Sequence, residues 1–173
     1  MHTQLVMTVI GDDRRGIVDS LASIVKHSGG NWLDSRMALL GGKFAGILRV
    51  SCPDEAVDSL RTALKALDKE GLEVHVEENR DTDTAIDAGE SIFMEVVGQD
   101  RPGIVSQISS AIASQGGNVE KLDTGCESAP MSGELLFTAR IKLRLPEGTS
   151  LDSLQDAIEK IAADLMVDIT FPE

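Results

Sequence analysis

The chain has 173 residues, of which 42% are hydrophobic and 26% are charged, so it is expected to fold into globular domains. Its formal net charge is −13 and it has no cluster of Lys and Arg, which argues against direct binding to nucleic acid or to an anionic membrane surface. No signal peptide, membrane span or metal-ligand spacing is evident in the sequence. These features predict a cytoplasmic protein without a cofactor or metal.

The first half of the chain predicts the element order β-α-β-β-α-β. Apolar runs and alternating residues indicate strands, and apolar residues at helical spacing indicate two helices that stop at glycines. The expected elements are a strand over 5–10, a helix from 17 to Gly29-Gly30, strands over 31–40 and 43–52 joined by a Gly41-Gly42 hairpin turn, a helix with Pro53 as its first residue and Gly71 at its end, and a strand over 72–77. Four alternate residues of the second strand are expected to share one face: Leu33, Ser35, Met37 and Leu39.

An internal repeat with an offset of 87 residues divides the chain. Residues 11–18 return as 98–105, and Gly29-Gly30-Asn31 returns as Gly116-Gly117-Asn118. The repeat predicts two domains, over 1–78 and 91–173, joined by an acidic linker over 79–90. Asp81, Asp83 and Asp87 in this linker lack the pattern of a calcium loop and are expected to be solvated.

The second copy predicts the same element order. The expected elements are a strand over 91–97, a helix from 104 to Gly116-Gly117, strands starting at 118 and spanning 134–145, a helix capped by Thr149 or Ser150, and a strand over 166–171. Aligning Gly42 with Gly133 implies four extra residues between the two middle strands of this copy. The order β-α-β-β-α-β, found twice, predicts an α+β protein of two ferredoxin-like domains, each an antiparallel four-stranded sheet with two helices on one face.

The repeated turn between the first strand and the first helix could bind a small amino acid. The first amides of a helix lack intrahelical partners and attract a carboxylate, and Gly16 leaves its backbone open to approach. Asp13 could cap the helix or accept a hydrogen bond from an ammonium group, and the amide of Asn31 could face the same crevice. The same residues recur 87 positions later. A purely structural reading, with a capping Asp, a turn Gly and an Asn after the Gly-Gly pair, remains open.

These motifs resemble those of a known regulatory module. Asp-Arg-x-Gly-Ile after a strand, followed by Gly-Gly-Asn after the helix, resembles the ACT domain, and the tandem pair resembles the family of glycine cleavage system transcriptional repressors. The resemblance implies a ligand at the interface of two modules, against the first turn and the start of the second strand. The ligand-binding residues that it implies are Gly11, Asp13, Arg14, Gly16, Ile17, Asn31, Gly98, Asp100, Arg101, Gly103, Ile104 and Asn118.

The resemblance also implies a function. It predicts a non-enzymatic regulator, without catalytic residues, that senses a small amino acid, with glycine favoured, and that represses glycine cleavage by contacting a transcriptional activator rather than DNA. A homo-oligomer is compatible with ligand sites between modules. The alternative is a stand-alone regulatory subunit of an amino-acid or one-carbon enzyme, since the module also resembles the N-terminal domain of formyltetrahydrofolate hydrolase. The second copy is the favoured working site because Pro102 replaces Arg15 there and stiffens the turn.

Overall fold

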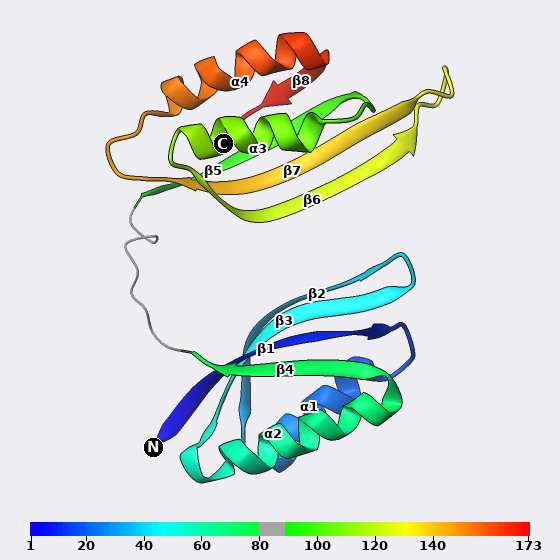
Figure 1. Ribbon diagram of the computed structural model, residues 1–173, viewed down its shortest axis with the longest axis vertical. Helices are drawn as coiled ribbons and strands as arrows, with labels where there is room; N and C mark the ends of the chain where they lie inside the picture. The colour runs from blue at the N-terminus through cyan, green and yellow to red at the C-terminus, as the bar shows by residue number, and fades with distance from the viewer. Residues whose placement is uncertain (80–88) are drawn as a thin grey trace. The chain divides into compact units, whose positions relative to one another are not determined.

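The computed structural model describes residues 1–79 and 89–173 (Figure 1). The chain divides into two compact units, residues 1–81 and 82–173, which we call the N-terminal and C-terminal units. Residues 80–88, which make up most of the expected linker and include Asp81, Asp83 and Asp87, lie outside the described residues.

The N-terminal unit is a four-stranded sheet with two helices on one face (Figure 1). The strands are ordered β2-β3-β1-β4, and each neighbouring pair is antiparallel. The elements in chain order are β1 His2–Asp12, α1 Ile17–His27, β2 Asn31–Leu40, β3 Lys43–Pro53, the 3₁₀ segment η1 Asp54–Ala56, α2 Val57–Lys65, the 3₁₀ segment η2 Ala66–Glu70, and β4 Leu72–Glu78.

The C-terminal unit repeats this architecture, with the strand order β6-β7-β5-β8. Its elements are β5 Glu90–Gln99, α3 Ile104–Ser114, β6 Asn118–Ser128, β7 Leu135–Leu145, α4 Leu151–Leu165 and β8 Val167–Thr170. Helices α3 and α4 cover one face of its sheet (Figure 1). Both units therefore have the predicted α+β, ferredoxin-like order.

Each unit has its own aliphatic core between the sheet and the helices. In β1 the alternate residues Leu5, Met7 and Val9 are buried, and the stripe of α1 adds Leu21 and Val25. The core of the C-terminal unit is built in the same way from apolar residues of β5, β7, α3 and α4. The opposite face of each sheet carries the other alternate residues, because side chains alternate between the two faces. These include polar residues and also exposed apolar ones, Ile10 and Ile47 in the N-terminal unit and Phe93 and Val97 in the C-terminal unit.

A β-bulge changes the predicted face of β2. The pairing with β3 steps from Trp32 to Asp34, so Leu33 is the extra residue. Trp32 consequently joins Met37 against the core, and the expectation that Leu33 shares the face of Met37 is wrong. A bulge at the same place in β6, between Val119 and Lys121, makes Glu120 the extra residue.

Two further expectations need correction. Pro53 ends β3 in an extended conformation, and η1 separates it from α2, so it is not the first residue of the helix. Gly11 pairs with Phe44 and Gly98 pairs with Phe137, so the middle strands are offset by 93 residues rather than 91. Six residues rather than four are therefore extra in the second copy, because the two glycines aligned in the sequence are not equivalent in register.

The last strand of the C-terminal unit is short. β8 pairs only with residues 95–98 of β5, whereas β4 pairs with residues 5–11 of β1. Continuing the register of β8 along β5 places Phe171 opposite Met94 and then Pro172 opposite Phe93, and Pro172 has no N–H to donate to a neighbouring strand. Within the described residues, no helix combines the length and the apolar character that crossing a membrane requires.

Candidate functional site

The two repeated turns share one backbone conformation. Helix α1 is preceded by Gly16 with φ 82°, and α3 is preceded by Gly103 with φ 92°. This left-handed region favours glycine, which explains both positions. Neither helix has a side-chain cap, so the expectation that Asp13 and Asp100 could cap them is wrong.

Backbone hydrogen bonds hold both turns against the neighbouring hairpin. The Asp13 N–H donates to the Gly42 carbonyl at 3.0 Å, and the Asp100 N–H donates to the Leu135 carbonyl at 2.9 Å. The first intrahelical bond of α1 runs from the Ser20 N–H to the Gly16 carbonyl at 2.9 Å, so the preceding amides of the first turn have no intrahelical acceptor. The space where a side chain of Gly16 would stand is open. The turn is thus a solvent-facing group of donors at the positive end of a helix dipole.

Some of the implied site residues have packing roles instead. A Cβ on Gly11 would lie 2.6 Å from the Gly71 carbonyl oxygen, and one on Gly98 would lie 2.5 Å from Cγ1 of Val167. The residue of the first strand that lies opposite the beginning of the last strand must therefore be glycine in each unit. Ile17 and Ile104 are buried in the cores. Gly11, Gly98, Ile17 and Ile104 therefore pack against the interior of their units and do not face the open space beside the turn.

The arginine of each turn reaches toward the end of the unit's second helical segment. An Arg14 Nη2 donor lies 2.9 Å from Oε2 of Glu70, whereas Arg101 Nη1 donates to the Asp164 carbonyl at 3.3 Å. The Arg14 contact is the stronger of the two, because it joins opposite charges, whereas the Arg101 contact is to a neutral carbonyl. In both units the arginine ties the turn to the segment before the last strand.

Asn31 and Asn118 lie at the opposite end of the sheet from the turns of their own units. Asn31 pairs with Ser51, which pairs with Gln4, seven residues before Gly11 on β1. At about 3.3 Å per residue, that separation is roughly 23 Å along the strand. Asn118 is placed in the same way through Arg144 and the start of β5. One unit therefore does not bring its turn and its asparagine into one crevice.

A contact between the C-terminal turn and β6 was not anticipated from the sequence. The carboxylate of Asp100 lies near the thiol of Cys126, whose pKa is raised by desolvation and by that neighbouring negative charge. No sequence signal joins the two residues, because the contact depends on the register of β6 beside β7. The position equivalent to Cys126 in the N-terminal unit is Leu39, so the contact is specific to the C-terminal unit.

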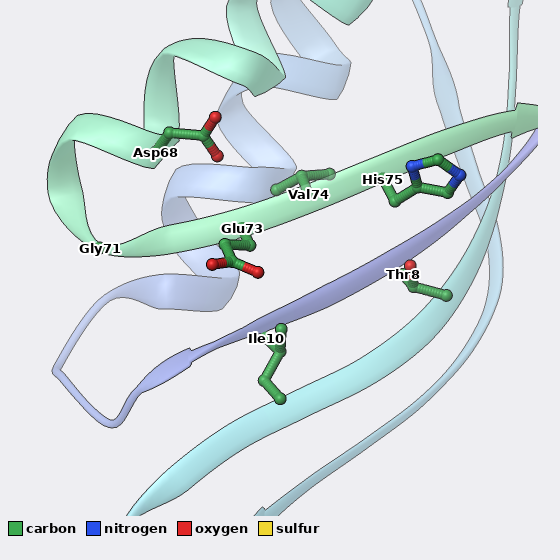
Figure 2. Close-up of a pocket in the computed structure, with 7 residues that line it drawn as sticks. All are labelled: Thr8, Ile10, Asp68, Gly71, Glu73, Val74 and His75. Carbon is green, nitrogen blue, oxygen red and sulfur yellow. The ribbon is translucent and has the colours of Figure 1, made fainter.

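A separate cleft of about 570 Å³ lies along β4 of the N-terminal unit (Figure 2). Its lining contains none of the residues implied by the sequence motifs. Asp68 and Glu73 make it acidic, and the His75 ring is held by Glu77, with 3.0 Å between Nε2 and Oε1. The lining residues are Thr8, Ile10, Asp68, Gly71, Glu73, Val74 and His75. Across the described ranges no three His, Cys, Asp or Glu side chains are grouped as metal ligands.

Comparison with known proteins identifies the fold and the relatives. The family profile of the ACT domain matches residues 3–77. The glycine cleavage system transcriptional repressor of Escherichia coli is 24% identical over 162 residues, which cover 93% of this chain and 85% of the repressor. A UPF0237 protein of Methanocaldococcus jannaschii is 33% identical over 75 residues, covering 43% of this chain and 82% of that protein.

Among solved structures, an unknown protein from Galdieria sulphuraria is 28% identical and matches with a TM-score of 0.84, covering 100% of this chain and 99% of that chain. The C-terminal unit repeats the fold and the turn motif of the N-terminal unit. The chain is therefore a tandem of two modules with the ACT fold, of which the N-terminal one matches the ACT domain family over residues 3–77, and it is similar across both modules to the glycine cleavage system transcriptional repressor.

Proposed function

We propose that this chain is an amino-acid-responsive regulator that binds glycine and acts by contact with a protein partner, a transcriptional activator. Its homology to a transcriptional repressor over 162 residues carries the proposal, since it extends across both modules. The charge of −13 agrees with a regulator that reaches DNA through a partner, because the phosphate backbone would repel it. The chain is proposed to have no enzymatic activity.

The ligand is proposed to sit against the turn of the C-terminal module. Its carboxylate would accept hydrogen bonds from the first amides of α3, and its ammonium group would donate to Asp100. Pro102 favours this copy, because a stiffer turn loses less entropy on binding. The turn is proposed to be held in shape by Gly98, Arg101, Gly103 and Ile104. In the other module, the turn around Asp13 is proposed to be held in the same way by Gly11, Arg14, Gly16 and Ile17.

Asn118 is proposed to reach the ligand from the module of a second chain. In an antiparallel pairing of two edge strands, the beginning of one strand lies beside the end of the other. The end of β6 is close to the turn, since the Asp100 N–H donates to the Leu135 carbonyl and Leu135 pairs with Ser128 of β6. A second β6 paired with this edge would therefore bring its own Asn118 toward Asp100, and Asn31 would approach Asp13 through β2 in the same way.

Ligand binding can be tested by thermal unfolding in the presence of each of the twenty amino acids. Glycine should raise the Tm, with a stabilisation of about 2.7 kcal/mol at a hundredfold excess over its Kd. Asn118→Ala should weaken binding by roughly 0.5–1.5 kcal/mol, the contribution of one hydrogen bond. Asn31→Ala is the matched control, with a smaller effect if the C-terminal site is the working one. Absence of a shift with every amino acid would reject the ligand proposal.

The protein contact needs a separate measurement. A tagged chain should retain a transcription factor from an extract, identified by mass spectrometry, and glycine should change the amount retained. Retention of an amino-acid or one-carbon enzyme instead would favour a regulatory subunit of that enzyme. If glycine binds but does not change the amount of any retained partner, the proposed ligand is supported and the proposed regulation is rejected.

A further inference from the structure

The last strand of the N-terminal unit leaves one edge of its sheet open. β4 is an outer strand of the order β2-β3-β1-β4, so only one side of its backbone pairs, with β1. The hydrogen bond from the Asn79 N–H to the Gln4 carbonyl fixes the pattern, because hydrogen-bonded pairs alternate along an antiparallel ladder. Val74 and Val76 fall between those pairs, so their N–H and C=O groups point away from β1 to the open edge.

The two parts of this edge differ in how they are covered. Arg61 of α2 covers the later part: its Nη1 donates to the Val76 carbonyl at 3.2 Å, and its Nη2 lies 3.6 Å from Oε1 of Glu78. Among the described residues, no side chain bonds to the outward N–H or C=O of Val74. The backbone of Val74 is therefore the part of the edge that remains open to a further strand.

The cleft along β4 meets this open backbone (Figure 2). Three consecutive residues of the strand line it, Glu73, Val74 and His75, and their side chains alternate between the two faces of the sheet. The cleft therefore follows the edge of the strand and not one face alone. Figure 2 shows Asp68 and Glu73 on opposite sides of β4. Its volume of about 570 Å³ is within the usual range of pockets that hold ligands.

Two carboxylates of the cleft have no partner of opposite charge. Within the described part of the chain, Asp68 and Glu73 take part in no ion pair and no side-chain hydrogen bond. The other carboxylates of this region are held within the unit: Glu70 by Arg14, Glu77 by His75, and Glu78 by Arg61. Two unpaired negative charges on either side of an open strand edge favour an occupant with positive side chains.

We propose that the edge of β4 binds an extended segment of a protein partner that contains two consecutive basic residues, which adds to the N-terminal sheet as a fifth strand. The backbone of the segment would exchange hydrogen bonds with the N–H and C=O of Val74. The basic side chain opposite Val74 would point to the side of Asp68, and the next one to the side of Glu73. The inference rests on the proposed function for the existence of a protein partner, and it adds the chemistry of the contact.

A second copy of this chain does not fit the same edge. Pairing two β4 strands would bring a second Asp68 and a second Glu73 to a place that already has two unpaired carboxylates, and like charges across strands are destabilising. The whole chain has a net charge of −13, which adds to the repulsion between copies. A basic segment of another protein is therefore the complementary occupant.

The C-terminal unit lacks the equivalent site. Its last strand, β8, has four residues, whereas β4 has seven. Asp68 lies three residues before Gly71, and Ala163 lies three residues before Met166, the residue with the equivalent positive φ. The charge and the length of the edge are thus features of the N-terminal unit alone.

NMR titration of the full chain with a synthetic peptide tests the site. The capped peptide acetyl-Val-Lys-Lys-Val-amide should shift the amide signals of residues 72–76 and protect the Val74 N–H from exchange with deuterium. The peptide with Glu in place of both Lys should shift none of them. Methylating the peptide nitrogens that face β4 should abolish binding, and methylating the other nitrogens should not. Equal binding of the Lys and Glu peptides would overturn the proposal, as would shifts confined to other residues.

Substitutions separate the charges from the backbone contact. Asp68→Asn and Glu73→Gln should each weaken peptide binding about two- to fivefold. Asp168→Asn is the matched control, because Asp168 has the register position of Glu73 in the C-terminal sheet, and it should have no effect. Val74→Pro removes the outward N–H but leaves the pairing with β1, and it should abolish binding by a chain that circular dichroism shows to be folded. Unchanged affinity in Asp68→Asn and Glu73→Gln would reject the charge argument.

The same measurements distinguish other occupants of the edge. Lysine amide that binds as tightly as the peptide would show a site for small cations and overturn strand addition. Self-association of the parent chain that Val74→Pro abolishes would show that a second copy occupies the edge, and it would overturn the proposal as well. Sedimentation velocity of the parent and the variant measures this association.

Retention of a partner from an extract distinguishes this proposal from the proposed function. Peptide binding at β4 by a chain that retains no partner would reject the proposed regulation and leave the β4 site intact. Glycine-dependent retention of a partner by a chain that binds no basic peptide, unchanged in Asp68→Asn and Glu73→Gln, would reject the β4 site and leave the proposed function intact.

Discussion

The glycines of the repeated turn are required for two different physical reasons. Gly11 has no room for a side chain beside the Gly71 carbonyl, whereas Gly16 has open space but a left-handed φ. Asn tolerates the left-handed region better than Ala, but it is larger. These reasons predict opposite rankings of substitutions at two positions that the sequence motif treats alike.

Gly11→Ala should lower the free energy of unfolding by about 1–3 kcal/mol, as overpacking does, and Gly11→Asn by at least as much. Gly16→Ala should cost about 1–2 kcal/mol because of its φ, and Gly16→Asn should cost less than Gly16→Ala. Urea denaturation of the four variants gives the ranking. If Asn is better tolerated than Ala at Gly11, the steric explanation fails.

Glu120 in the bulge of β6 predicts a pH-dependent contribution to stability. Its pKa is lowered chiefly by the hydrogen bond from Arg144, helped by Lys142, at 2.7 and 3.4 Å. A carboxylate with a lowered pKa stabilises the fold above its unfolded pKa, and this contribution is lost as the pH falls through the folded pKa. Glu120→Gln should therefore cost up to about 1 kcal/mol at pH 7, and the difference from the wild type should shrink toward pH 3.5.

Urea midpoints at several pH values test this behaviour. Glu159→Gln on the exposed face of α4 is the control for loss of one carboxylate. A cost of Glu120→Gln that stays constant with pH would show that the ion pair is not its source.

At the scale of elements, the structure shows which of two residues caps the N-terminus of α4, since the sequence allowed either Thr149 or Ser150. The Ser150 side chain accepts from the Ser153 N–H at 3.2 Å, so Ser150 rather than Thr149 is the N-cap. Ser150→Ala should lower the free energy of unfolding by about 1 kcal/mol, and Thr149→Ala should have a much smaller effect. Circular dichroism during urea denaturation measures both. Equal costs would mean that the cap does not carry the effect.

The elements were predictable from periodicity and glycines, but the register between them was not. The strand predicted over 31–40 coincides with β2. The bulge at Leu33 depends on the pairing with β3, so the sequence of β2 alone does not reveal it. The candidate site is a different case. The turn precedes α1 and Asn31 follows it, so the predicted helix of 11 residues already separates them by about 17 Å, and the expectation of one shared crevice overlooked that length.

At the scale of the whole molecule, the charge predicts how the protein behaves with DNA. The purified chain should not shift duplex DNA at physiological salt, because its charge of −13 opposes the counterion release that drives such binding. An electrophoretic mobility assay at several salt concentrations tests this. Sequence-specific binding that weakens steeply with salt, in the absence of a partner, would contradict it.

The two modules also differ in how firmly their first strands are held. The Asn79 N–H donates to the Gln4 carbonyl at 2.8 Å, so hydrogen-bonded pairs alternate from Gln4 and include Val6. The equivalent of Val6 is Phe93, which lies beyond residues 95–98, the part of β5 that pairs with β8, so no residue of β8 accepts its N–H. The Phe93 amide should therefore exchange its proton for deuterium faster than the Val6 amide. The duplicated modules would then differ in local opening, with the C-terminal one fraying first at the beginning of β5.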